Sequence, residues 1–136
     1  MKTIVVLAVG IVLVSILFCP MVMAAPSMPA DLQIVQPDPS LPKELSAFFG
    51  KWEGTGAYQY FLIVEKIDDE KASIYVWQVI AEIGYSWTRY EAQVIKEGGK
   101  YQLFYSSRSG PIQLTLKGEY LNYSGPSASI KLKRVT

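Results

Sequence analysis

Hydrophobic and polar residues alternate with a period of two through most of the chain after residue 50. Ile112, Leu114 and Leu116 alternate with polar neighbours, and Ile130 and Leu132 alternate with lysines near the end. This period is typical of strands with one buried face and one face in water. The pattern predicts eight strands, at residues 51–58, 60–67, 72–79, 87–95, 100–106, 112–117, 120–124 and 128–135.

The segments between these strands carry the residues that tight turns need. Most are short and rich in Gly, Asp, Ser or Pro, whereas the connection at residues 80–86 is longer and apolar. No helical crossover separates any two strands, so we expect antiparallel neighbours in a meander. Eight such strands leave no open edge if they close. The fold class predicted is all-β, an eight-stranded antiparallel up-and-down barrel.

A short helix is predicted just before the first strand. Leu41, Leu45 and Phe48 fall on one stripe, Ser40 is placed to cap the helix, and Gly50 to end it. The preceding residues 25–39 contain four prolines and are expected to form an extended tether rather than a folded element. The barrel domain is therefore assigned to residues 40–136.

The first 24 residues have the layout of a secretory signal peptide. Lys2 provides the charged start, an apolar run follows, Pro20 breaks it, and Ala24 ends a small-residue cleavage site. This predicts an exported protein, periplasmic or secreted. Because the run from residue 4 to 25 is long enough to span a bilayer, an uncleaved membrane anchor is the alternative, and a lipoprotein through Cys19 is a weaker one.

Composition narrows the chemistry of the remaining chain. Without residues 1–24 it has 12 basic and 12 acidic residues, no cysteine and no histidine. Such a balance gives no basic surplus for nucleic acid. His- and Cys-dependent catalysis and zinc or copper sites with His or Cys ligands are excluded. Carboxylate chemistry, a Lys or Tyr base and an all-oxygen cation site remain possible. An enzyme is therefore the disfavoured class, and we expect no cofactor and no metal.

The predicted second, third and fourth strands carry apolar or aromatic residues on both faces. In the second strand, Tyr60, Leu62 and Val64 oppose a set formed by Phe61, Ile63 and Ile67. Both faces should therefore be covered. The second cover could be the tether and helix, another subunit, or a ligand.

One face of these three strands combines charges with aromatic rings. The candidate ligand-binding residues on it are Glu65, Tyr75, Trp77, Trp87, Arg89 and Glu91. If this face lines the barrel, an acid–Arg–acid cluster among rings would orient a small, partly apolar or aromatic ligand. If it faces water, the same charges form a surface ladder of ion pairs of little energetic weight.

The segment Gly50-Lys51-Trp52, preceded by a short helix, resembles the first-strand motif of lipocalin and avidin-like barrels, the calycins. More narrowly, residues 48–54, 62–67, 72–77 and 87–89 resemble small bacterial exported lipocalin-like domains without an assigned activity. The resemblance implies that Trp52 closes the barrel base beneath Arg134, in a cation–π pair. It also implies an eight-stranded barrel that is filled by side chains or holds one small ligand.

Three functions follow from these patterns. The first is an exported, non-catalytic barrel that binds a small molecule through the candidate residues above. The second is a structural or interaction protein whose second to fourth strands form a subunit or partner interface, giving a homo-oligomer in one version. The third is a carboxylate hydrolase with Glu65 and Glu91 as an acid/base pair.

Overall fold

The computed structural model describes residues 26–54, 60–80, 84–126 and 128–135. It contains one short helix, α1 (Lys43–Ser46), followed by strands. These are β1 (Gly50–Gly54), β2 (Phe61–Ile67), β3 (Lys71–Ile80), β4 (Gly84–Glu97), β5 (Lys100–Ser107), β6 (Gly110–Lys117), β7 (Tyr120–Ser124) and β8 (Ser129–Arg134).

The eight strands form a closed barrel in sequence order, and every pair is antiparallel. The predicted fold class is therefore confirmed. β3 and β4 pair from Lys71↔Gln93 to Ile80↔Gly84, further toward their connection than the pattern predicted. The predicted end of the first strand, at residues 55–58, lies outside the described residues.

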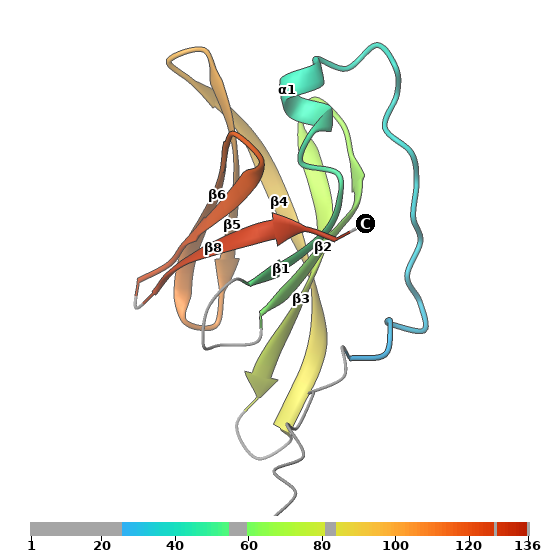
Figure 1. Cartoon of the computed structure of the whole chain (residues 1–136), viewed down its shortest axis with the longest axis vertical. Coiled ribbons are helices and arrows are strands. Elements are labelled where there is room, and N and C mark those ends of the chain that lie inside the picture. Colours follow the sequence, from blue (N-terminus) through green and yellow to red (C-terminus); the bar gives the residue numbers. More distant parts are fainter. Residues whose placement is uncertain (1–25, 55–59, 81–83, 127, 136) are drawn as a thin grey trace, which may run out of the picture.

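The barrel has two different ends, which Figure 1 separates. The helix end carries α1 and the turns β2–β3, β4–β5 and β6–β7. The far end carries the connections β1–β2, β3–β4, β5–β6 and β7–β8, and the β3–β4 hairpin projects there beyond its neighbours.

The helix end is closed by α1 and by Trp52. Phe48 and Trp52 are each 1% exposed, and the Trp52 indole Nε1 donates a hydrogen bond of 3.0 Å to the Phe48 carbonyl. The Arg134 guanidinium lies 4.3 Å from the centroid of the Trp52 ring and donates to the carbonyl oxygens of Phe49 (2.7 Å) and Ala47 (2.5 Å). The two residues of the Gly-x-Trp resemblance, Trp52 and Arg134, thus lie in contact.

Gly50 is required for this closure. Its φ of +123° is a backbone conformation that side chains rarely adopt, and a Cβ there would lie 2.8 Å from Arg134 Nη1. Helix α1 differs from the prediction at both ends, since it stops at Ser46 and Gly50 already belongs to β1. Its N-cap is Pro42 with no side-chain cap, and the Ser40 backbone N–H instead donates to Asp38 Oδ1 (2.8 Å).

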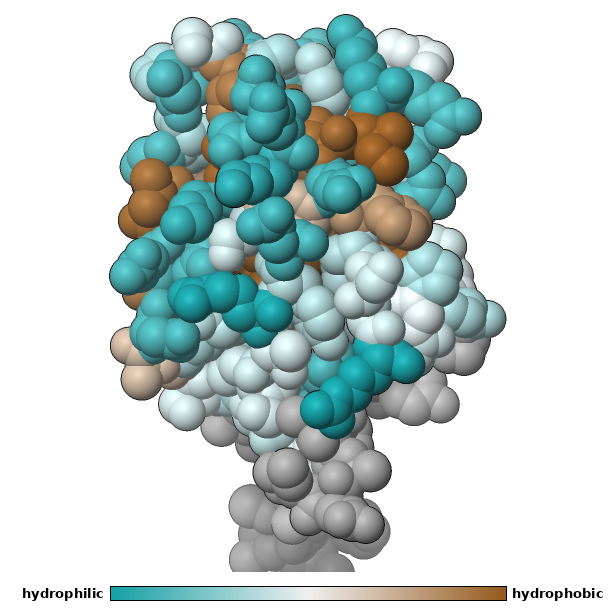
Figure 2. Space-filling model, turned by 180° about the vertical axis from the view of Figure 1, so that it is seen from behind, coloured by the Kyte–Doolittle hydropathy of each residue, from teal (hydrophilic) through white to brown (hydrophobic). Residues whose placement is uncertain are grey.

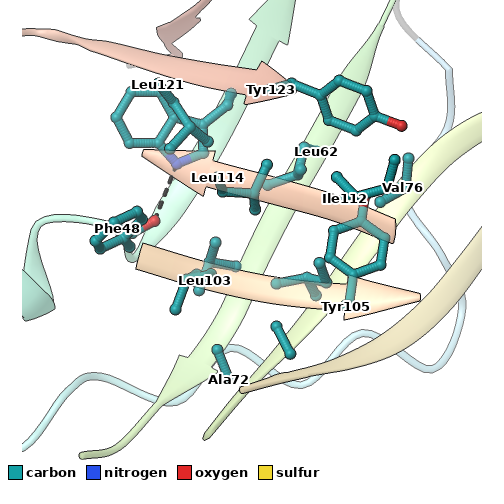
Figure 3. Close-up of a cluster of buried hydrophobic side chains, with 14 of the residues drawn as sticks. Phe48, Leu62, Ala72, Val76, Leu103, Tyr105, Ile112, Leu114, Leu121 and Tyr123 are labelled. Carbon is teal, nitrogen blue, oxygen red and sulfur yellow. Dashed lines mark hydrogen bonds between the residues drawn. The ribbon is translucent and has the colours of Figure 1, made fainter. Parts of the chain in front are cut away.

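Inward-facing side chains fill the barrel next to this closed end (Figure 3). The core includes Leu62, Val76, Leu103, Leu114, Leu121 and Leu132, all at most 1% exposed. A bulge between Val64 and Lys66 changes the register of β2. As a result Ile67, predicted on the face of Phe61 and Ile63, packs in the core instead.

Candidate functional site

The predicted site residues lie on the outside of the barrel. Val76 of β3 is in the core and pairs with Thr88 of β4, so their neighbours Tyr75 and Arg89, which also pair, point outward. The six residues Glu65, Tyr75, Trp77, Trp87, Arg89 and Glu91 share this outer face of β2, β3 and β4. The hypothesis that this face lines the barrel interior is therefore wrong.

The outer face is covered by the chain's own N-terminal segment, residues 26–39, which we call the strap. The strap has no helix or strand and runs along the barrel toward α1 (Figure 1). The backbone N–H of Val35 donates to the Glu65 carbonyl (2.8 Å), and the indole Nε1 of Trp87 donates to the Ser27 carbonyl (2.8 Å). Of the three covers considered from the sequence, the structure shows the tether on this face, whereas helix α1 lies at the end of the barrel.

Glu65 anchors the strap electrostatically. Its side chain is 1% exposed and accepts hydrogen bonds from Ser73 Oγ (2.6 Å), the Gln33 backbone N–H (2.9 Å) and Arg89 Nε (3.0 Å). Burial alone would raise the pKa of Glu65, but these hydrogen bonds and the charge of Arg89 outweigh burial and lower it. Glu65 is therefore held ionised, which does not suit a general acid.

Arg89 joins the strap to the strands. Besides Glu65 it donates to the Asp31 carbonyl oxygen (2.9 Å), and its Nη1 lies 3.4 Å from an Asp31 carboxylate oxygen. Its guanidinium also lies 4.6 Å from the centroid of the Tyr75 ring. Burial, together with the nearby Asp31 carboxylate, raises the pKa of Tyr75 to about 12, although its hydroxyl has no partner in hydrogen-bonding geometry. These contacts attach the strap to the strands.

Aromatic rings continue from this ion pair toward the far end. Tyr75 and Trp87 meet edge-on at 6.4 Å between centroids, Trp87 and Trp77 at 5.4 Å, and Trp77 stacks on Tyr85 at 5.7 Å and 7°. Exposure rises along the row, from 3% at Tyr75 to 55% at Tyr85. We call Trp77, Tyr85 and Trp87 the aromatic tip.

A cleft of about 880 Å³ lies between the strap and the strands near the helix end. Glu65, Arg89 and Glu91 line it together with Asp38, Lys71 and other polar residues. Glu91 is exposed and pairs with Lys71 at 3.9 Å, so it does not join Glu65 as a coupled carboxylate. Within the described residues no group of His, Cys, Asp and Glu is arranged to hold a metal ion.

Four tyrosines inside the barrel form a cluster that the sequence-based site did not include. Tyr90, Tyr105 and Tyr123 come from β4, β5 and β7, Tyr60 directly precedes β2, and all four lie inside the barrel away from α1. The centroids of Tyr60 and Tyr123, and of Tyr90 and Tyr105, are 4.8 Å apart. Figure 3 shows Tyr105 and Tyr123 at one side of the core and Phe48 at the other.

The hydroxyls of this cluster are incompletely satisfied. Tyr105 is 3% exposed, and its hydroxyl has no partner in hydrogen-bonding geometry, although the Tyr123 side chain is near enough to contribute to its raised pKa. Burial, with smaller contributions from neighbouring tyrosines, raises the pKa of both Tyr60 and Tyr105. Tyr90 differs, because Gln78 Nε2 donates to its hydroxyl (2.9 Å) as well as to Thr88 Oγ1 (3.1 Å). Polar groups therefore converge inside this part of the barrel.

The sheet is also open on one side of the cluster. β4 pairs with β5 only from Gln93↔Phe104 to Glu97↔Lys100. The part of β4 from Gly84 to Ala92 pairs with β3 alone, and Tyr105 pairs with β6 alone. The contact between Tyr90 and Tyr105 bridges the strands where their ladder has ended. The alternation of apolar and polar residues along the strands is enough to place the tyrosines on the inward face. Only closure of the barrel brings the four tyrosines together.

No protein-family model, curated protein or solved structure matches the chain. In the described parts of the chain, no helix combines the length and the apolar character that a membrane span requires. The class that the geometry defines is a closed eight-stranded antiparallel barrel with a plugged helix end, a strapped outer face and a cluster of tyrosines inside the far end.

Proposed function

We propose that the protein is an exported, lipocalin-like barrel that binds a small, partly apolar molecule without catalysis, and that the ligand lies among the four interior tyrosines. This moves the predicted binding function from the outer face to the inside of the far end. The Trp52–Arg134 closure supports the lipocalin-like assignment, since it closes the opposite end as that resemblance implies.

The observation that carries the proposal is the Tyr105 hydroxyl. A buried polar group without a partner costs about 1–3 kcal/mol, so such groups normally have one. The hydroxyl lies among aromatic rings, which offer apolar walls, and near Tyr60 and Tyr123. A ligand with an apolar body and a polar group that accepts a hydrogen bond supplies both kinds of contact.

The interface alternative has less support. The centre of the β2–β4 outer face, at Glu65 and Tyr75, is 1% and 3% exposed because the strap lies on it. A subunit or partner could reach these residues only after displacing the strap. A hydrolase using Glu65 and Glu91 is disfavoured because each carboxylate is paired with a different cation.

A fluorescence titration of the full chain tests the proposal. N-phenyl-1-naphthylamine, an uncharged dye that brightens in apolar sites, should bind the wild type and be displaced by dodecanoate. Thr88→Trp adds an inward ring beside Tyr90 and should abolish dye binding. An unchanged dye signal in Thr88→Trp would place the dye elsewhere and overturn the proposal.

The hydroxyl itself is tested by Tyr105→Phe, with Tyr101→Phe as the matched control. Tyr101 lies on the same face of the same strand but at the helix end, where it contacts Lys96. Loss of one hydrogen bond of about 1 kcal/mol should weaken dodecanoate binding about fivefold in Tyr105→Phe only. Equal affinities in the two variants would contradict the role given to Tyr105.

A further inference from the structure

The two ends of the barrel differ in the number of charged residues that they carry. At the helix end, three turns and the strand residues beside them carry Asp68, Asp69, Glu70, Lys71, Lys96, Glu97, Lys100, Lys117 and Glu119. At the far end, the described residues of the corresponding connections and the strand residues beside them carry only Arg108 and Glu53. Glu82, in the β3–β4 connection, lies outside the described residues. In Figure 2 much of the lower half is pale, although some of the most strongly hydrophilic residues lie there and the upper half also carries most of the hydrophobic residues in view.

The weakly charged end instead presents aromatic rings. Trp77, Tyr85 and Trp87 form the aromatic tip of the projecting β3–β4 hairpin, where the Tyr85 side chain is 55% exposed and the two tryptophans are partly exposed. Trp and Tyr combine a large apolar ring with a polar group, and they concentrate where a bilayer meets water. A row of stacked rings at an end with few charges therefore fits the headgroup region of a membrane.

The chain enters the barrel at this same end. Residues 4–25 form an apolar run of 22 positions, long enough to span a bilayer. The strap begins immediately after it, and Ser27 accepts the hydrogen bond from Trp87 of the aromatic tip. While the apolar run is in a membrane, during export or as a lasting anchor, the aromatic tip is therefore the part of the barrel held closest to the bilayer.

We infer that the aromatic tip is a lipid-contact surface, which seats the far end of the barrel on a membrane. The three observations that carry the inference are the charge division, the aromatic tip and the point where the apolar run joins the strap. It goes beyond the proposed binding function and does not depend on it, since an empty barrel would dock in the same way. If both hold, the ligand enters from the membrane side.

Tryptophan quenching in vesicles tests the inference with the full chain. The protein has three tryptophans, and Trp52 lies buried at the helix end, away from the aromatic tip. In phosphatidylcholine vesicles containing a lipid spin-labelled near its headgroup, Trp77 and Trp87 should be quenched and Trp52 should not. The double variant Trp77→Phe, Trp87→Phe should therefore lose the quenching.

Two charge variants separate docking from simple tethering by the apolar run. Tyr85→Glu places a charge at the aromatic tip, and Tyr120→Glu places one on a tyrosine that is 38% exposed at the helix end. We expect Tyr85→Glu to lose most of the quenching and Tyr120→Glu to keep it. Membrane-bound wild type without quenching, or equal quenching in the two charge variants, overturns the inference.

Discussion

The attachment of the strap makes a quantitative prediction at Arg89. Replacing Arg89 with Met keeps an unbranched apolar stem of similar length to that of Arg but removes the guanidinium charge opposite Glu65. Glu65 then remains 1% exposed with only Ser73 and the Gln33 backbone as partners. The variant should therefore be less stable, and its strap should detach more readily.

The size of the loss follows from the contacts. Arg89 makes one close hydrogen bond to Glu65 (3.0 Å) and one long one (3.5 Å), and its own side chain is 42% exposed. A hydrogen bond to a charged group contributes about 1.5–3 kcal/mol, and solvent screening favours the lower half of that range. We expect a loss of about 2 kcal/mol, which lowers Tm by about 8–16 °C for a domain of this size.

Urea unfolding and limited proteolysis measure the two effects. Lys71→Met is the matched control, because it breaks the exposed pair with Glu91 at 3.9 Å and should cost about 0–1 kcal/mol. Cleavage within residues 26–39 should be faster in Arg89→Met than in wild type or control. Equal stability and equal cleavage of the two variants would refute the account of the strap.

Three further predictions concern the closed end and pH. Gly50→Ala should cost more than Gly118→Ala in urea unfolding, since both have positive φ but only at Gly50 does a Cβ meet Arg134; equal losses would contradict this. Arg134→Lys should cost about 1–2 kcal/mol, because an ammonium cannot reach the carbonyls of both Ala47 and Phe49 and also cover the indole; an unchanged urea midpoint would refute that. Because the folded-state pKa of Glu65 is lowered, its stabilisation is present above its usual pKa of about 4.3 and is lost as pH falls through the folded-state value. The urea concentration at the unfolding midpoint of the wild type should therefore fall when the pH is lowered from about 5 to about 3, and the difference in midpoint between wild type and Arg89→Met should become smaller. A difference that stays constant with pH would contradict the role of the ion pair.

The barrel was predictable because its signals are local. Alternation in residues such as Ile112 and Leu114, together with turn residues at short intervals, is enough to define strands and their antiparallel order. Trp52 and Arg134 could be paired because the resemblance to calycins carries a contact between the first and the last strand.

The orientation of Arg89 was not predictable from its strand. Tyr75 and Arg89 were correctly placed on one face, but both faces of β2 to β4 are apolar, so alternation could not say which is inside. The deciding element is the strap, whose prolines give no periodic pattern. The bulge at Glu65 adds a second difficulty, because it shifts Ile67 from the expected face into the core.

The tyrosine cluster depends on contacts between distant strands. Tyr60 and Tyr123 meet only because the barrel closes, and Tyr90 and Tyr105 meet where the β4–β5 ladder has already ended. Each tyrosine alone looks like an ordinary core residue. The unpartnered hydroxyl of Tyr105 is a property of three-dimensional packing, which alternation along a strand does not carry.

The most direct test of the central claim is the position of a bound ligand. Full chain carrying ¹³C-labelled tyrosine rings, titrated with dodecanoate and observed by NMR, should show shifts at Tyr60, Tyr90, Tyr105 and Tyr123. Tyr75, beneath the strap, and Tyr120, at the helix end, should stay unchanged. Shifts at Tyr75 with a silent interior cluster would contradict the account and return the binding site to the outer face.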